Sequence, residues 1–263
     1  MIADLTGKNA LITGSSSGLG KGIAQILAQQ GASIIVADID GEGAKLAANE
    51  FINLGYQAVS LQMDVTNIDS VDKAVSKAIN QIGHIDKLVN NAGVIGAPGW
   101  HERLEVTEAD WDFTFNVNVK GIVHVTERIQ DDMIKEAEGS IVNIASVAGK
   151  MGNPDRPTYN ASKAAAISYT KSSALKLAKF NINVNCICPG NIWTPMWDKI
   201  SMRQFNFGSE IFSEFSDVDI VVHNVGGGIG INDPCANLDQ WLSVWMLNIG
   251  IAIEINNLLI PRM

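Results

Sequence analysis

The chain has 263 residues, 46% of them hydrophobic, and carries a formal net charge of −9. This composition provides a well-buried core for one large or two small domains. The acidic balance argues against nucleic-acid binding, which needs a basic surface, and no run of about 18 apolar residues predicts a membrane span.

The N-terminal segment MIADLTGKNALITG lacks the basic start and long apolar stretch of a signal peptide, so we expect a cytoplasmic protein. The first 190 residues then alternate between short β-branched runs and longer segments with helical spacing. Because the short runs are apolar on both faces, they predict a doubly wound parallel sheet, the Rossmann α/β fold. The strands are predicted at 9–13, 33–37, 58–63, 85–90, 139–145 and 182–188.

The first three strands are each followed by a predicted helix with a glycine at its end, at Gly31, Gly55 and Gly83. A glycine just past the last helical residue favours a left-handed cap. The apolar residues at helical spacing are Ile23, Ile26 and Leu27, then Leu46 and Phe51, then Val71, Ala74 and Ile79.

The first strand runs directly into TGSSSGLG, in which three glycines have the spacing G-x3-G-x-G. Glycine lets the backbone turn sharply and approach a pyrophosphate closely. The helix that follows offers free N–H groups and the positive end of its dipole. We therefore expect a dinucleotide to contact this turn at Gly14, Ser16, Ser17, Gly18, Leu19 and Gly20.

The second strand is predicted to end at Asp38. A carboxylate there accepts both ribose hydroxyls of NAD and repels the 2′-phosphate of NADP. Neither the serines of the turn nor Ile39 supplies a cation for that phosphate, so we expect NAD. The alternative is a solvated loop acid, because DIDGEG also has the composition of a turn. Asp64, at the end of strand three, is a lesser candidate for contact with the adenine amine.

After the fourth strand, a helix is predicted to begin at Thr107, with Asp110 completing a capping box. Asn118 falls on the apolar seam of this helix, where a leucine would pack better. A polar residue at that place predicts a hydrogen-bond partner or a kink. The seam itself consists of Trp111, Phe115, Ile122, Val125, Ile129 and Met133.

Downstream, YNASK places Tyr159 and Lys163 four residues apart, on one face of a helix. Ser146 ends the fifth strand thirteen residues before the tyrosine. A free tyrosine has a pKa of about 10, and catalysis by its phenolate requires that pKa to fall by about 2–3 units. A lysine ammonium and a nicotinamide cation would together supply this. Ser146 would hold the substrate oxygen as hydride leaves the adjacent carbon.

With these motifs, the chain resembles a short-chain dehydrogenase/reductase from residue 5 to about 200. The matching segments are TGSSSGLG, DV at 64–65, NNAG at 90–93, NVNVKG at 116–121, Ser146, YNASK and CPGNIWTPM at 188–196. The resemblance implies that Tyr159 is the general acid/base and that Lys163 lowers its pKa and binds the nicotinamide ribose. It also implies that Ser146 orients the substrate and that Asn118 completes a proton relay through water and Lys163.

The resemblance further implies an NAD-dependent oxidoreductase whose substrate is a secondary alcohol, polyol, sugar alcohol or hydroxylated ring, or the matching ketone. Relatives pair through the long helices after strands four and five, so a homodimer is expected, and a tetramer would need the C-terminal segment. The further cofactor contacts implied are Asp64, Val65, Asn91, Ala92, Gly93, Tyr159, Lys163, Pro189, Gly190, Ile192 and Thr194.

The C-terminal segment departs from the family pattern, so we predict a Rossmann core at 1–200 and an atypical segment at 201–263. DVDIVVHNVGGGIG at 217–230 resembles HIDKLVNNAGVIGA at 84–97. Residues 216–263 thus resemble a second, partial copy of strand four and its helix. Three explanations stay open: a seventh strand with an added helix, a fusion of two related reading frames, and chance similarity.

Two other function classes compete with the dehydrogenase. The first is an NAD-binding protein with little turnover, because the substrate region is replaced. The second, a methyltransferase on a similar sheet, gives no reason for Ser146, Tyr159 and Lys163 to occur together. No metal is expected, because the four histidines show no ligand spacing. The three cysteines form no even framework and are expected to be reduced.

Overall fold

The computed structural model describes residues 4–190, 192, 194–196 and 198–200. Met1–Trp100 and Glu105–Pro189 form one compact unit, which contains the sheet. The other unit combines His101–Leu104 with Gly190–Met263. The predicted second copy at 216–263 and its proposed seventh strand lie outside the described residues.

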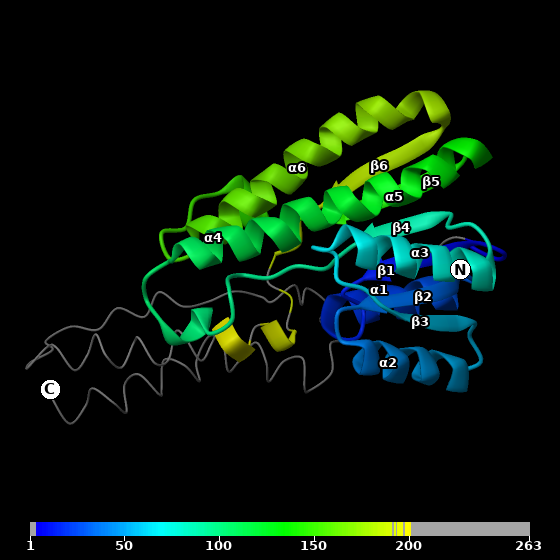
Figure 1. The fold of residues 1–263 in the computed structure, drawn as a ribbon, viewed down its shortest axis with the longest axis horizontal. Coiled ribbons are helices and arrows are strands. Elements are labelled where there is room, and N and C mark those ends of the chain that lie inside the picture. Colours follow the sequence, from blue (N-terminus) through cyan, green and yellow to red (C-terminus); the bar gives the residue numbers. More distant parts are fainter. Residues whose placement is uncertain (1–3, 191, 193, 197, 201–263) are drawn as a thin grey trace, which may run out of the picture. The chain divides into compact units, whose positions relative to one another are not determined.

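The first unit is built on a six-stranded parallel sheet in the order β3-β2-β1-β4-β5-β6 (Figure 1). This confirms the doubly wound α/β fold predicted from the sequence. The strand order reverses between β1 and β4, and in such sheets the ligand crevice lies at the carboxyl ends of the strands at this point. The strands are β1 (Asn9–Thr13), β2 (Ser33–Asp38), β3 (Ala58–Gln62), β4 (Lys87–Asn90), β5 (Gly139–Ile144) and β6 (Ile182–Ile187).

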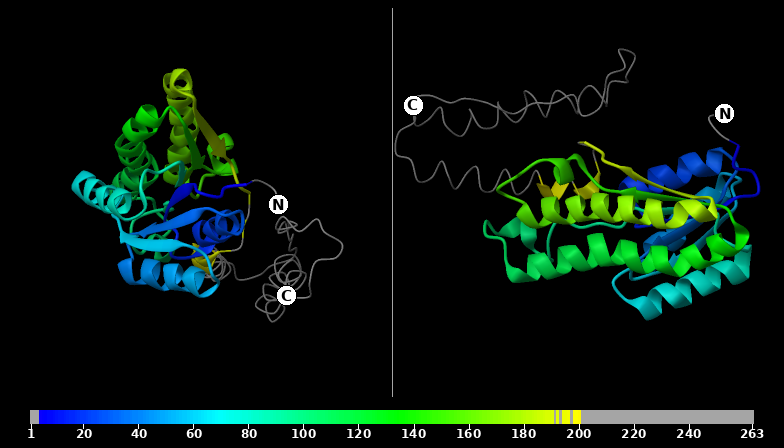
Figure 2. Two further views of the ribbon diagram at one scale, coloured as in Figure 1. Left: turned by 90° about the vertical axis from the view of Figure 1, so that its right-hand side faces the viewer. Right: turned by 90° about the horizontal axis from the view of Figure 1, so that it is seen from above.

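Helices cover both faces of the sheet (Figures 1 and 2). One face packs against α1 (Gly18–Gln29) and α2 (Gly41–Asn53). The other packs against α3 (Ile68–Ile82), α5 (Gly121–Glu136) and α6 (Pro157–Leu177). The shorter elements are α4 (Glu108–Phe115), the π-turn η2 (Asn116–Lys120) and the 3-10 turns η1 (Trp100–Glu102), η3 (Val147–Lys150) and η4 (Ala178–Phe180). Within the described part of the chain, none of the helices is long and apolar enough to cross a membrane.

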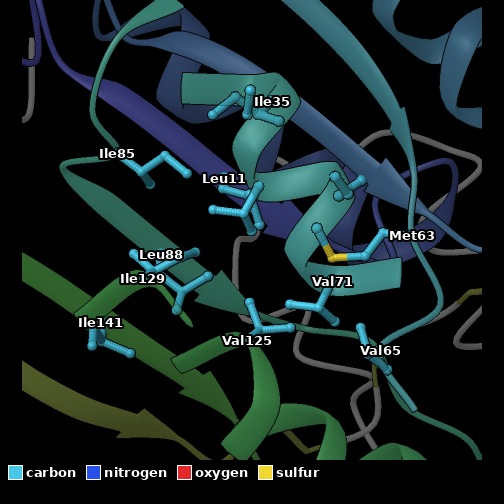
Figure 3. Packing of buried hydrophobic residues seen from close by; sticks show 14 of the residues in the cluster. Leu11, Ile35, Met63, Val65, Val71, Ile85, Leu88, Val125, Ile129 and Ile141 are labelled. Atoms are coloured by element: carbon cyan, nitrogen blue, oxygen red, sulfur yellow. The ribbon is translucent and has the colours of Figure 1, made fainter. Parts of the chain in front are cut away.

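The two faces of the sheet have separate hydrophobic cores. Leu11 belongs to the core under α3 and α5, whereas its neighbours Ala10 and Ile12 belong to the core under α1 and α2. Figure 3 shows Leu11 in the same core as Val71 of α3 and Val125 of α5. Burying a side chain of this size contributes about 1.5–3 kcal/mol, so both faces of each strand must be apolar.

The ends of the first three helices follow the sequence prediction. Gly31, Gly55 and Gly83 have φ values of 97°, 87° and 90°, a region that L side chains rarely adopt. The inner faces of α1 and α2 consist mainly of alanines, which let these helices lie close to the sheet. Ile26 and Leu46, which are 54% and 64% exposed, therefore lie outside the core, although Phe51 is buried.

The long helix predicted from Thr107 is divided into α4, η2 and α5. The Asp110 carboxylate accepts a hydrogen bond from the Thr107 N–H at 2.9 Å, as the capping box predicts. The predicted seam is buried along α5, but Trp111 on α4 is 37% exposed, so that prediction was wrong. The wider turn of η2 rotates the helix face between the two segments, and sequence periodicity does not register this change.

A buried polar ladder joins β4 and β5 at their carboxyl ends. Asn90 and Asn143 are register partners, and the Asn90 side-chain amide donates to Asn143 Oδ1 at 2.8 Å. Asn90 also donates to Thr126 of α5 at 3.0 Å, and Asn143 donates to Thr170 of α6 at 2.9 Å. The ladder therefore fixes both helices and the loops that follow the two strands.

Candidate active site

The turn after β1 is shaped for close contact with a ligand. Gly14 has φ 62°, and a Cβ there would lie 2.8 Å from Ala92 Cα. A Cβ at Gly20 would collide with the Gly14 carbonyl oxygen and the Asn91 side-chain amide. Neither position therefore accepts a side chain.

The helix that leaves this turn has no side-chain cap. Ser17 occupies the N-cap of α1 without a capping hydrogen bond, whereas Asp40 caps α2 and Asn67 caps α3. The first N–H groups of α1, at Gly18 and Leu19, are thus not satisfied by the capping side chain. Unsatisfied N–H groups and a positive dipole end fit the pyrophosphate of a dinucleotide.

Asn91 and Thr13 tie the ends of β4 and β1 together. The Asn91 amide donates to the carbonyl oxygens of Thr13 and Gly14 at 3.0 and 2.9 Å. Thr13 Oγ1 accepts from the backbone N–H groups of Asn91 and Ala92, each at 3.0 Å. Sequence reasoning placed Asn91 and Ala92 at the cofactor but missed Thr13, although it opens the TGSSSGLG motif.

Asp38 is oriented by the same turn. One oxygen accepts from the Ser16 N–H at 3.0 Å, and the other accepts from the Asp40 N–H at 3.1 Å. A carboxylate has about four acceptor sites, so both oxygens keep capacity for ribose hydroxyls. The two backbone N–H groups thus hold the Asp38 carboxylate in one orientation.

Asp64 and Val65 follow β3 and are held by local contacts. Asp64 Oδ1 accepts from the N–H and hydroxyl of Thr66 at 2.9 and 2.7 Å. The Val65 carbonyl oxygen lies 2.9 Å from His124 Nδ1 of α5. The predicted contact of Asp64 with the adenine amine therefore depends on its other carboxylate oxygen, and the predicted cofactor contact of Val65 stays a prediction.

Ser146 and Tyr159 meet at the carboxyl end of β5. Ser146 Oγ accepts from the Ala148 N–H at 3.1 Å, and its hydroxyl lies near enough to the Tyr159 phenol to lower the pKa of that phenol. Burial raises the pKa of Tyr159, and the Ser146 hydrogen bond and the positive charge of Arg156 only partly offset this. The phenol is therefore protonated at neutral pH in the protein alone.

Lys163 lies one helical turn after Tyr159 and is buried. Its Nζ donates to the Ile144 carbonyl oxygen at 2.9 Å and lies 5.6 Å from the centre of the Tyr159 ring. Burial lowers the pKa of Lys163 to about 8, although Cys186 and Cys188, when ionised, act in the opposite direction. The resemblance implies that Lys163 lowers the Tyr159 pKa, but the pKa of Tyr159 reflects burial, Ser146 and Arg156 here.

Asn118 has both of the features predicted for a polar residue on an apolar seam. It lies in the π-turn, and it is fully buried with three hydrogen bonds. Its Oδ1 accepts from the Val94 N–H at 2.8 Å, and its Nδ2 donates to the Val94 carbonyl oxygen at 2.8 Å and to Ser162 Oγ at 3.0 Å. The sequence pattern does not single out Ser162, although this residue lies inside the YNASK motif.

The remaining predicted residues divide between the two units. Gly93 lies beside Lys163 and Asn118, and the Pro189 carbonyl oxygen accepts from the Val147 N–H at 3.0 Å. Gly190, Ile192 and Thr194 belong to the other unit, so their contact with a cofactor stays a prediction. Across the residues that the structure describes, no group of three or more histidines, cysteines or acids has the arrangement of a metal site.

Comparison with known proteins identifies relatives over most of the chain. Residues 8–205 match the family described as short chain dehydrogenase. The oxidoreductase UcpA of Salmonella typhimurium is 44% identical over 203 residues, which span 77% of this chain and 75% of the relative.

Two solved structures have the same fold. An NAD⁺-bound xylitol dehydrogenase is 34% identical with a TM-score of 0.71, over 82% of this chain and 81% of that one. A gluconate 5-dehydrogenase from Burkholderia cenocepacia, in complex with NADP and tartrate, is 32% identical with a TM-score of 0.68. That match covers 73% of this chain and 74% of the other.

Proposed function

The chain belongs to the short-chain dehydrogenase/reductase family, and from this membership we propose that it interconverts a secondary alcohol and its ketone with NAD. Members of the family are oxidoreductases that use a nicotinamide cofactor. When bound, that cofactor accepts or donates the hydride. The remaining chemistry falls to this chain's own side chains.

The observation that carries the proposal is that Ser146 and Lys163 both lie beside Tyr159, with Lys163 Nζ 5.6 Å from the centre of the phenol ring. An alcohol oxygen placed against both groups would be held by Ser146 and would give its proton to the phenolate of Tyr159. In the reverse direction, the Tyr159 phenol would donate that proton to the ketone oxygen. Lys163, buried next to Tyr159, would exchange protons with it and hold a nearby ribose hydroxyl.

NAD is proposed over NADP because Asp38 presents a negative charge beside the phosphate turn. A 2′-phosphate there would meet a carboxylate instead of an arginine or lysine. Relatives of both kinds exist, because the xylitol dehydrogenase is bound to NAD⁺ and the gluconate 5-dehydrogenase is in complex with NADP. These two relatives also favour a polyol or sugar-derived alcohol as substrate. We further propose a cytoplasmic homodimer, which light scattering would test.

A second candidate is an NAD-binding protein with little turnover. It is supported by the extent of the family model, which matches residues 8–205. The two candidates share the cofactor and differ in whether Tyr159 works as an acid/base. A measurement of substrate turnover therefore distinguishes the dehydrogenase from the NAD-binding protein.

The test is a panel of secondary alcohols and polyols with NAD⁺, followed by the absorbance of the reduced nicotinamide. We expect oxidation whose rate rises with pH, because the phenolate is the active form. Tyr159→Phe should lower the rate at least about 100-fold. Tyr56→Phe is the matched control, because Tyr56 packs beside α2 in the core of the other sheet face and its loss should leave the rate unchanged. Tight NAD⁺ binding with no turnover on any alcohol would favour the second candidate.

A further inference from the structure

Two cysteines lie two residues apart at the carboxyl end of β6. Cys186 belongs to the strand, and Cys188 follows its last residue. The hydrogen-bond ladder continues past the strand, because the Val147 N–H donates to the Pro189 carbonyl oxygen at 3.0 Å. A residue that precedes proline also favours extended backbone. Side chains two residues apart in an extended segment point to the same face of the sheet, so both thiols share one face.

The face that the two thiols share is the one covered by α5 and α6. Cys186 and Cys188 both pack in a small cluster with Ile122 of α5 and Ala166 of α6. Burial raises the pKa of Cys186, and the neighbouring Cys188 thiol also raises it. The two thiols therefore lie near one another, and both are half-buried and free of a disulfide.

The spacing of the two thiols disfavours a disulfide but suits a bound ion. A parallel strand rises about 3.3 Å per residue, so the two Cβ atoms are about 6.6 Å apart. A disulfide requires about 3.8 Å between Cβ atoms, which the extended segment cannot reach while its ladder is intact. An ion at about 2.3 Å from each sulfur requires the sulfurs to be about 4.6 Å apart, and rotation of the two side chains provides this distance.

A positive charge lies beside the two thiols. Lys163 Nζ donates to the Ile144 carbonyl oxygen at 2.9 Å, and Ile144 is the register partner of Ile187, which separates the two cysteines. Two thiolates around a monovalent cation carry one net negative charge, which the Lys163 ammonium group would neutralise. This balance matters because an unpaired charge is costly to bury.

We propose that Cys186 and Cys188 bind a soft monovalent cation, with Lys163 balancing the charge of the complex. Thiolates select soft ions, and Cu(I) is such an ion and is stable with two thiolate ligands. Structural zinc requires four ligands, whereas the described residues contain no group of three or more candidate ligands. Binding would release the two thiol protons to solvent. The site is independent of the proposed dehydrogenase activity.

The test is an anaerobic titration of the reduced protein with Cu(I) against bathocuproine disulfonate, a chelator whose Cu(I) complex is coloured. We expect the unmodified protein to withdraw about one Cu(I) per chain from the chelator. Cys186→Ser or Cys188→Ser should weaken binding at least about 100-fold, because even the loss of an outer-shell partner costs about 10–100-fold in affinity. X-ray absorption of the loaded protein should show two sulfur ligands.

Two controls distinguish this site from general thiol and lysine chemistry. Cys235→Ser removes the third thiol of the chain and should leave the Cu(I) affinity unchanged. Lys163→Met should weaken binding at least about tenfold, because the negative charge of the complex loses its partner. Lys171→Met, at an exposed position of the same helix, should leave the affinity unchanged.

Equal Cu(I) affinity in the unmodified protein and in both serine variants would overturn the proposal. A loss in Cys235→Ser as large as in Cys186→Ser, or three or more sulfur ligands on the ion, would also overturn it, because the site would then not be this pair. If a serine variant did not fold, an unchanged affinity in Lys163→Met would still contradict the proposed charge balance. None of these measurements needs NAD⁺ or a substrate, so a chain without turnover would contradict the proposed function and still test this inference.

Discussion

Lys163 places an ammonium group where water cannot solvate it. Its pKa of about 8, against an ordinary value of 10.5, reflects that burial. A difference of this size corresponds to about 3 kcal/mol of destabilisation while the group is charged. At neutral pH the protein therefore loses stability to keep a positive charge beside Tyr159. Such a cost is common at functional sites and uncommon elsewhere.

Lys163→Met should for this reason stabilise the fold while removing activity. The substitution abolishes the buried charge but also a hydrogen bond to Ile144, worth about 1 kcal/mol, so we expect a net gain of about 2 kcal/mol at pH 7. The folded pKa lies below the unfolded one, so the unmodified protein gains stability as pH rises from about 8 to 10.5. Urea denaturation should show that Lys163→Met exceeds the unmodified protein in free energy of unfolding by less at pH 10 than at pH 7. An equal difference at both pH values would contradict the explanation.

Sequence reasoning selected candidate reacting residues but not the residues that hold them in place. Tyr159, Lys163 and Ser146 stand out because their side chains have chemistry of their own at a recognisable spacing. The hydroxyls of Thr13 and Ser162 hydrogen-bond to residues far along the chain, and such contacts have no local sequence pattern. They become visible only when the fold brings their partners together.

Helices and strands were predictable from the sequence where their pattern depends on neighbouring residues. The strands, the glycine ends of three helices and the capping box at Thr107 all depend on a few neighbouring residues. The prediction of a hydrogen-bond partner or a kink at Asn118 is confirmed, because this buried amide has hydrogen-bond partners and lies in the π-helical segment η2. The exposure of Trp111 was not predictable, because it follows from the rotation that the π-turn introduces.

At the opposite end of the sheet, Asp86 connects the starts of β1 and β4. Its buried carboxylate accepts a hydrogen bond from the Asn9 N–H at 2.8 Å and forms an ion pair with Lys8 at 3.2 Å. It also lies 3.0 Å from His84 Nε2 and forms a second ion pair when the His84 imidazole is protonated. Burial alone would raise the pKa of Asp86, but the Asn9 N–H, Lys8 and His84 outweigh it and lower the pKa below 3.8.

Asp86→Asn should therefore destabilise the protein by about 2–3 kcal/mol at pH 7, because it leaves Lys8 without its buried partner. A carboxyl with a lowered folded pKa stabilises the fold above pH 3.8, and this contribution is lost as pH falls through the folded pKa. Thermal denaturation should show the two proteins converging below pH 3.8. Glu138→Gln is the control, because Glu138 binds Lys8 from a 52% exposed position, where solvent screens the ion pair, and should destabilise the protein less than Asp86→Asn does. If Glu138→Gln lost more stability than Asp86→Asn, the stabilising role assigned to Asp86 would be contradicted.

At the scale of the whole molecule, a cofactor that binds the folded protein raises its thermal stability. The preference for NAD⁺ over NADP⁺ can therefore be tested without a substrate. A ligand that binds only the folded state at 100 times its Kd stabilises it by about 2.7 kcal/mol. For a domain of this size we expect NAD⁺ to raise Tm by about 5–10 °C. NADP⁺ at the same concentration should raise it less, because Asp38 repels the additional phosphate. Asp38→Ala should bring the two shifts together, and a greater shift with NADP⁺ in the unmodified protein would contradict the proposed preference.

The ladder of Asn90 and Asn143 has a consequence for quality control in the cell. If β5 slipped by one residue along β4, these amides would be buried without each other, at about 1–3 kcal/mol apiece. The same slip would carry Ser146 away from Tyr159. Misregistered chains would therefore be both inactive and unstable, so proteases would degrade them before they accumulated as intact but useless enzyme.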